Sequence, residues 1–201
     1  LGEAALAHLP VGEEPAARRH HLDAPGDQPG EVVPGGRARP HAGGHGGRAM
    51  MRAAGRGMRC CMIQFMKAKT DRYGEHESAE ALGIEVHTMG DGFTWDTQNP
   101  EQDIKTSRET WALCVEKMRS EDYDLLVFDE LVYVLDYKFL DLREVLGEIK
   151  AVREKQPNLH LVLTGRNAPA ELVEAADLVT EMKEIKHPFH AGIFAQQGIE
   201  F

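Results

Sequence analysis

The stretch "DLLVFDE" (residues 124–130) decides how the rest of the chain is interpreted. Its four apolar residues have the length of a buried strand, and the two carboxylates Asp129 and Glu130 end it. The run "LHLVL" (159–163) ends in the same way on the polar segment "TGRN" (164–167). Ligands of open α/β sheets bind at the carboxyl ends of parallel strands. The two runs therefore predict a ligand site at one edge of a sheet.

Strand-like and helix-like stretches alternate from residue 50 onward. The patterns predict strands over 58–68, 83–90, 123–130 and 159–165 and a closing strand within 180–189. They also predict the last turns of a helix over 50–57 and helices over 101–120, 140–156 and 168–179. Glycine ends the first helix, and Pro157 stops the third. Alternation of this kind predicts a parallel α/β sheet with helices on both faces.

Composition and charge exclude several classes of protein. The 201 residues suffice for one well-buried domain, and 33 acidic against 23 basic residues give a net charge of −10. That charge disfavours nucleic acids and anionic membranes as partners. No apolar run reaches the roughly 18 to 20 residues of a membrane span, and no signal peptide is recognisable, so we expect a cytoplasmic protein. Three cysteines, two of them adjacent, offer neither a disulfide framework nor a CxxC metal site.

Residues 1–49 differ in composition from residues 50–201. Gly, Ala, Pro, Arg and His make up 35 of the first 50 residues, and all aromatic residues lie after them. Such a composition is typical of disorder. We therefore expect an α/β domain over 50–201, preceded by a segment that is either disordered or the product of a shifted reading frame.

The reading-frame hypothesis rests on the segment Gly36 to His41, "GRARPH". The codons GGG AAG GGC AAG ACC ACA encode Gly-Lys-Gly-Lys-Thr-Thr, a phosphate-binding sequence. Read one base later, they give Gly-Arg-Ala-Arg-Pro, followed by His if a pyrimidine comes next. The hypothesis is that a phosphate-binding loop is encoded here in another frame.

The strand ends carry the candidate chemistry. Asp129 and Glu130 are placed to hold Mg²⁺ at a nucleotide phosphate, and the alternative is an acidic pair that caps the next helix. Gly165 permits close approach of a ligand, and Arg166 can form a forked contact with a phosphate or carboxylate; the alternative is an arginine that is simply solvated, as most are.

An aromatic pair and several histidines leave further alternatives. Phe93 and Trp95, in "GDGFTWDTQN", alternate with small or polar residues, so their rings can project together onto a flat ligand or anchor the loop to the core. The histidines do not form a matched metal set, and His187 and His190 in "KHPFHAG" are left without an assigned role.

Four ordered motifs together resemble one family. They are "GFTWDTQN", "FDELVYVL", "LTGRNAP" and "EMKEIKHPFHAGIFAQQGIEF", and the resemblance runs from about Met50 to Phe201. The chain is similar to the P-loop type of ATP:corrinoid adenosyltransferases, which act on cob(I)alamin or cob(I)yrinic acid a,c-diamide. The resemblance implies a RecA-like P-loop NTPase fold, a homodimer, and transfer of the 5′-deoxyadenosyl group of ATP to Co(I) of a corrinoid. Triphosphate leaves, in adenosylcobalamin synthesis or salvage.

The resemblance also implies roles for particular residues. Asp129 and Glu130 match the segment that holds Mg²⁺. Gly165, Arg166 and Asn167 match a segment that contacts ATP, and contact with the corrinoid is the alternative for Arg166 and Asn167. Phe93 and Trp95 match the rings that lie against the lower face of the corrin, and a reduced flavoprotein is the implied electron donor.

One departure from the family is large. The family has a glycine- and lysine-rich loop where this chain has "GGRARPHAGGHGG" (35–47), and no GxxxxGK[ST] occurs in the sequence. The first strand of the sheet is also missing from the pattern. We therefore expect weak catalysis and a marginal fold. The alternatives are a corrinoid-binding remnant that has lost ATP and, less well matched to the motifs, a generic P-loop ATPase.

Overall fold

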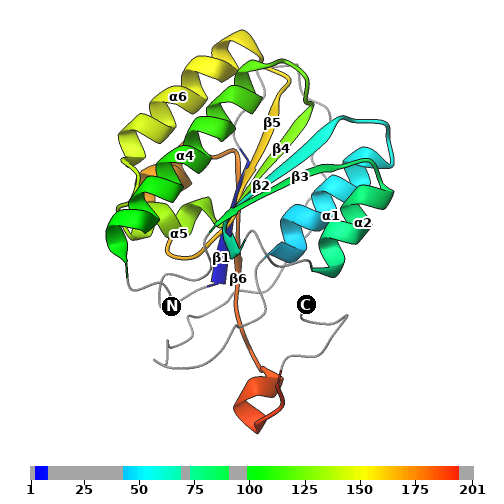
Figure 1. Ribbon diagram of the computed structural model, residues 1–201, viewed down its shortest axis with the longest axis vertical. Helices are drawn as coiled ribbons and strands as arrows, with labels where there is room; N and C mark the ends of the chain where they lie inside the picture. Colours follow the sequence, from blue (N-terminus) through cyan, green and yellow to red (C-terminus); the bar gives the residue numbers. More distant parts are fainter. Residues whose placement is uncertain (1–2, 9–42, 69–72, 91–98, 195–201) are drawn as a thin grey trace.

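The computed structural model describes residues 3–8, 43–68, 73–90 and 99–194. In chain order the elements are β1 (Glu3–His8), α1 (Gly43–Ala54), β2 (Cys60–Ala68), α2 (Gly74–Ala81), β3 (Glu85–Gly90), α4 (Pro100–Arg119), β4 (Leu125–Asp129), α5 (Leu131–Asp136), α6 (Leu142–Lys155), β5 (His160–Leu163), α7 (Ala170–Ala175), β6 (Leu178–Met182) and the 3₁₀ helix η1 (Pro188–Ala191) (Figure 1). No helix of these ranges is long and apolar enough to cross a membrane.

The sheet contains six strands in the order β3-β2-β4-β5-β1-β6. The strands β3, β2, β4 and β5 pair in parallel, so their carboxyl ends meet at one edge. We call this edge the carboxyl edge and the opposite one the amino edge. The predicted parallel sheet is confirmed for these four strands.

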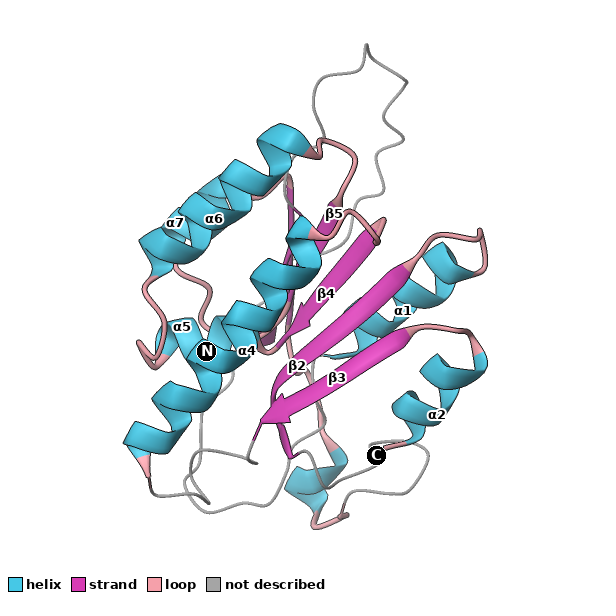
Figure 2. Ribbon diagram, turned by 45° about the horizontal axis from the view of Figure 1, so that its top comes forward, coloured by secondary structure: helices cyan, strands magenta, loops and turns pink. Residues whose placement is uncertain are grey.

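Helices cover both faces of the sheet (Figure 2). Residues alternate between the two faces along each strand, as the pleat requires. On one face, α4, α5, α6 and α7 pack on side chains that include Cys61, Ile63, Phe65, Leu126, Phe128, Leu161 and Leu163. On the other, α1 and α2 pack on Cys60, Met62, Leu125, Val127 and Val162. This second face, which we call the α1 face, carries the candidate site.

The N-terminal strand β1 differs from the expectation that the first strand is missing. It lies between β5 and β6 and pairs with both, but it runs antiparallel to them. Ala7 lies opposite Leu163 and His8 opposite Val162, so β1 runs toward the amino edge. In a P-loop fold the phosphate loop follows a strand directly at the carboxyl edge. In the described part of the chain, β1 fills a place in the sheet beside β5, but it runs antiparallel to β5 and does not end at the carboxyl edge.

The first helix spans Gly43–Ala54, so residues 50–54 are its last turns, as the sequence predicted. Its end is as predicted: Gly57 has a φ of +78°, and the amide of Met58 donates to the carbonyl of Ala53 at 3.1 Å. A glycine in this conformation satisfies the last carbonyls of the helix without steric cost.

The helices α2 and α5 were not predicted, and α7 is shorter than predicted. The run "LVYVL" of α5 continues the apolar run of β4 in the sequence, but Glu130 adopts left-handed backbone angles between them and turns the chain. The helix α7 ends at Ala175, because Leu178 and Val179 pair with β1 as part of β6. The short polar helix α2 has little apolar periodicity in its sequence. Tertiary pairing overrides local pattern in such cases.

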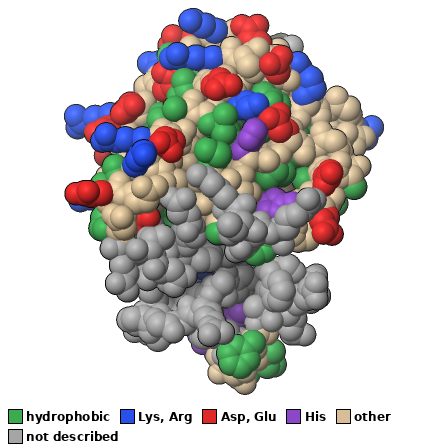
Figure 3. Space-filling model, viewed as in Figure 1, with side chains coloured by type: hydrophobic (Ala, Val, Ile, Leu, Met, Phe, Trp, Pro, Cys, Tyr) green, Lys and Arg blue, Asp and Glu red, His purple; other side chains and the backbone are tan. Residues whose placement is uncertain are grey.

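Charge is distributed unevenly over the face seen in Figure 3. Basic and acidic side chains are interspersed over the body of the molecule, whereas the lower tip carries apolar side chains (Figure 3). Ile193 and Phe194, which follow η1, are 49% and 77% exposed.

Candidate active site

Three polar side chains meet on the α1 face where the parallel strands end. Gln64 of β2 lies beside Asp129 of β4 in the sheet register, and Thr164 directly follows β5. All three are buried. Each lies two residues after a core residue of its own strand that faces α1, namely Met62, Val127 or Val162. Because side chains alternate along a strand, all three therefore face the same side.

Asp129 is the centre of this cluster. It is 1% exposed; its Oδ1 accepts a hydrogen bond of 2.7 Å from the hydroxyl of Thr164, and its Oδ2 accepts one of 3.2 Å from Nε2 of Gln64. Burial, and then the adjacent charge of Glu130, raise the pKa of Asp129. A buried carboxylate beside a second acid is destabilised as an anion, so a bound cation would stabilise it.

Thr164 connects the two acids. Its hydroxyl donates to Asp129 and accepts a 2.9 Å hydrogen bond from the amide of Glu130. Glu130 has a φ of +66°, an uncommon conformation for a residue with a side chain. The hydroxyl of Thr164 therefore holds the turn in which Glu130 is buried at the end of β4.

The first turn of α1 lies directly over this cluster. A Cβ on Gly46 would be 2.9 Å from Cγ1 of Val127 and 3.6 Å from Cγ2 of Thr164. Glycine at position 46 thus lets the helix approach the strand ends closely. The amino end of α1 consequently faces the same edge as Asp129.

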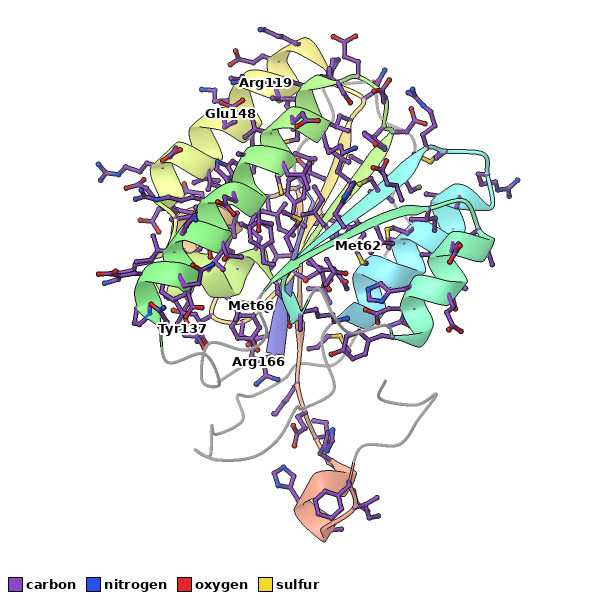
Figure 4. The ribbon with its side chains drawn as sticks, in the orientation of Figure 1. Met62, Met66, Arg119, Tyr137, Glu148 and Arg166 are labelled. Carbon is purple, nitrogen blue, oxygen red and sulfur yellow. The ribbon has the colours of Figure 1, made fainter. Side chains whose placement is uncertain are left out.

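The predicted nucleotide segment Gly165 to Asn167 lies at the same edge. Gly165 has a φ of +142°, and a Cβ there would be 2.6 Å from Cβ of Val132, so packing against α5 is sufficient to require glycine. Nδ2 of Asn167 donates to Oδ2 of Asp136 at 2.8 Å. Arg166 is half-buried and lies at the carboxyl edge, as Met66 does, while Arg119 and Glu148 lie at the amino edge (Figure 4).

A polar network extends from Gln64 toward β3 and α2, and the sequence analysis missed it. Oε1 of Gln64 accepts from the hydroxyl of Thr88 at 2.9 Å, and its Nε2 donates to Oε1 of Glu75 at 2.9 Å as well as to Asp129. His76 Nε2 lies 2.8 Å from Oε1 of Gln64. The sequence signal was a glutamine and a lysine, Gln64 and Lys67, in a strand of otherwise apolar residues, where a buried polar group costs free energy unless it is hydrogen-bonded.

Lys67 adds a buried cation to the network. Its ammonium, on a residue 3% exposed, forms an ion pair with Glu75 and lies 5.1 Å from the centroid of the Tyr73 ring. Burial alone would raise the pKa of Glu75, but the charge and hydrogen bond of Lys67 outweigh it and lower that pKa. Lys67 also favours the ionised form of Asp129.

Comparison with known proteins assigns the family. A model of the family "ATP:corrinoid adenosyltransferase BtuR/CobO/CobP" matches residues 46–201. The chain belongs to this family. A corrinoid adenosyltransferase of Sinorhizobium sp is 42% identical over 148 residues, which are 72% of this chain and 67% of that protein. Those of Pseudomonas aeruginosa and Escherichia coli are 40% and 37% identical over 146 and 140 residues, covering 72% and 70% of this chain and 70% and 69% of their own lengths.

The adenosyltransferase match confirms the family and the fold class predicted from the four motifs. Four parallel strands flanked by helices form the P-loop NTPase-like sheet expected of the family. Phe93 and Trp95, the predicted corrinoid contacts, lie outside the described residues, and the segment 91–98 that contains them directly follows β3.

The oxygen atoms of the cluster around Asp129 fit Mg²⁺. Carboxylate and hydroxyl oxygens are the ligands that this ion prefers, and Asp129 and Glu130 supply two buried carboxylates at a strand end. The hydrogen bonds of Asp129 occupy one position on each oxygen, and each oxygen has two lone pairs.

A second cluster in the described residues resembles a metal site but is better explained as an ion pair. Ligand atoms of Cys61, Glu85 and His87 lie within 4.8 Å of one another. Lys117 and Tyr123 bind the two carboxylate oxygens of Glu85, however, and burial raises the pKa of Cys61 to about 12. His187 and His190 lie in the C-terminal segment, where His190 pairs with Glu184 at 2.6 Å, away from both clusters.

Proposed function

We propose that this adenosyltransferase binds MgATP at the carboxyl edge of its sheet and a Co(I) corrinoid beside it. The observation that carries the proposal is the buried Asp129 cluster at the strand ends, in a chain of this family. In the reaction, a Co–C5′ bond forms and the bond from C5′ to the triphosphate oxygen breaks. The electron pair of the broken bond leaves with triphosphate, so the protein need not supply a covalent nucleophile.

The residues of the chain act by position and charge. Asp129 and Glu130 are the proposed ligands of Mg²⁺, which when bound neutralises charge on the departing triphosphate. Arg166 is the proposed cation for a phosphate oxygen, while Gly165 and Asn167 shape the turn that presents it. Asn167 does so through its hydrogen bond to Asp136.

Phe93 and Trp95 are proposed to lie against the lower face of the corrin. Two rings there exclude an axial ligand from cobalt, which makes Co(II) easier to reduce. A reduced flavoprotein is the proposed electron donor. We further propose a homodimer acting in the cytoplasm, in the synthesis or salvage of adenosylcobalamin.

We also propose that residues 1–49 include a segment translated in a shifted frame. Two observations support this: the family match begins at residue 46, and β1 runs opposite to the direction that a P-loop strand requires. Sequencing the gene across codons 30–50 tests the idea. We expect that a one-base change of the reading frame restores a Gly-Lys-Gly-Lys-Thr run. If no frame encodes such a run, the hypothesis is refuted.

The transfer itself is tested with the full chain, MgATP and chemically reduced cobalamin. We expect slow, Mg²⁺-dependent formation of the Co–C bond with release of triphosphate, because no phosphate-loop lysine is present. Asp129→Asn should lower the single-turnover rate by about 100-fold, the usual cost of one charge-stabilising group. The exposed Asp122→Asn is the control and should not change it.

Two outcomes would contradict this proposal. Absence of any enzyme-dependent Co–C bond would reject adenosyl transfer by this chain. Turnover equal to that of the Escherichia coli relative would reject the expected impairment.

A further inference from the structure

We propose that Gln64 is a positioning residue that couples the Asp129 carboxylate to β3. This strand precedes residues 91–98, which contain Phe93 and Trp95 and which we call the corrinoid segment. The inference rests on the proposed function, and it adds a connection between the two substrate sites. Gln64 touches neither the metal nor the corrinoid in this proposal. It acts through Asp129 on one side and through Thr88 on the other.

The position of Gln64 in the sheet makes this coupling direct. Gln64 lies on β2, between β3 and β4, and it is the register partner of both Thr88 and Asp129. Its side chain is 0% exposed. No water need be invoked between the two neighbours, because one amide group reaches both of them.

Every hydrogen-bonding position of the Gln64 amide is used. Nε2 donates to Asp129 and Glu75, and Oε1 accepts from Thr88. The amide of Tyr73 donates to Nδ1 of His76 at 3.0 Å, so the proton of a neutral imidazole is on Nε2, which then donates to Oε1 of Gln64. This pattern permits one orientation of the amide, since a flip would place Oε1 against the two carboxylates and Nε2 against the N–H of His76.

The bond to Asp129 restricts how that carboxylate can turn. Thr164 holds Oδ1 and Gln64 holds Oδ2, from neighbouring strands on opposite sides. The remaining lone pairs therefore have fixed directions. Partners of this kind, which orient a ligand without touching the metal, typically change metal affinity by about 10- to 100-fold when they are removed.

The bond to Thr88 restricts the end of β3. Thr88 is two residues before Gly90, where β3 ends and the segment with Phe93 and Trp95 begins. A Cβ on Gly90 would lie 2.5 Å from the carbonyl oxygen of Lys67, so β3 packs closely on the end of β2. A displaced Gln64 would therefore alter the end of β3 as well as the carboxylate.

The test measures binding of Mn²⁺ and of cob(II)alamin separately, on the full chain without ATP. Free Mn²⁺ is followed by electron paramagnetic resonance and cobalamin by absorbance. Gln64→Met keeps the length of the side chain and removes the amide; we expect Mn²⁺ affinity to fall about 10-fold and cobalamin affinity to fall with it. Gln156→Met, at a partly buried glutamine bonded to the carbonyl of Met118, is the matched control and should change neither.

A second variant separates the two arms of the network. Thr88→Val removes the bond to β3 and leaves Asp129 in place, so cobalamin affinity should fall while Mn²⁺ affinity stays within about twofold. If Gln64→Met does not fold, as judged by its thermal unfolding curve, Gln64→Asn replaces it with the same expectation, because the shorter amide cannot reach both strands. A folded Gln64 variant with parental Mn²⁺ affinity would overturn the inference.

The corrinoid assignment of the proposed function has its own readout. Phe93→Ala with Trp95→Ala should weaken cobalamin binding and leave Mn²⁺ binding unchanged. Unchanged cobalamin binding in that double variant would reject the corrinoid role of the rings, whereas the effect of Gln64 on Mn²⁺ would stand or fall independently.

Discussion

The two edges of the parallel sheet use charge in opposite ways. At the amino edge, opposite charges are paired near the surface: Arg59 with Asp124, Lys117 with Glu85, and Arg119 with Glu148. At the carboxyl edge, the buried Lys67 pairs with Glu75, but Asp129 and Glu130 are adjacent, buried and of the same sign. The amino edge thus balances its charges in pairs, whereas the carboxyl edge keeps two like charges side by side.

The pKa shifts follow this difference. At the amino edge, burial opposes ionisation of Glu85, but hydrogen bonds from Lys117, Tyr123 and His87 prevail and lower its pKa to about 2. At the carboxyl edge, burial raises the pKa of Asp129. A residue whose charge costs free energy in the folded state is a better functional candidate than one whose charge stabilises it.

The largest expected effect on stability compares a glycine from each edge. Gly165→Ala should lower the free energy of unfolding by about 3 kcal/mol, because a positive φ and a clash with Val132 add together. Gly57→Ala, at a φ of +78° with nothing within 4 Å of its Cβ, should cost about 1 kcal/mol. Urea unfolding of both variants measures the difference, and equal losses would show that the clash is relieved at no cost.

A smaller effect is expected at Glu85, and it depends on pH. Because the folded pKa lies near 2 and the ordinary value is 4.5, the unfolded chain binds more protons between these values. The stability from Glu85 is therefore complete above pH 4.5 and is lost as the pH falls toward 2. Since the side chain is 40% exposed and screened by water, Glu85→Gln should cost about 1 kcal/mol at pH 7.

The measurement is urea unfolding of the parent and of Glu85→Gln at pH 7, 4 and 3. The difference in unfolding free energy between the parent and Glu85→Gln should shrink as the pH falls from 7 to 3. Glu116→Gln, at an exposed position on α4, is the control and should not alter the curve. A loss for Glu85→Gln that does not change over this range would contradict the ion-pair explanation.

The smallest effect is expected for the surface pair at the amino edge. Nε of Arg119 donates to Oε1 of Glu148 at 2.8 Å, and the arginine side chain is 63% exposed. Arg119→Ala should change the unfolding free energy by less than about 0.5 kcal/mol, as solvated pairs usually do. A double-mutant cycle with Glu148→Ala at low and high salt measures the interaction energy of the two side chains. An interaction energy of about 2 kcal/mol would contradict this prediction and show that the pair stabilises the fold.

The sequence predicted the strands and the acidic strand end because both have strong local signals. Apolar runs that stop on polar residues placed Asp129 and Thr164 at one edge, and the structure brings them within hydrogen-bonding distance. The hydrogen bonds among Gln64, His76 and Thr88 could not be predicted, since they depend on strand order and register. The direction of β1 was also out of reach, because six residues of mixed character pair equally well either way.

The reversed β1 has a practical consequence for laboratory work. A sheet accepts a strand of either polarity as long as amides and carbonyls find partners, so the pairing of β1 with β5 and β6 does not show that a strand of P-loop direction fills this place. Circular dichroism would register β1 as a strand in either direction. Stabilisation by added nucleotide would distinguish the two directions, because only a strand that ends at the carboxyl edge can lead into a phosphate loop there.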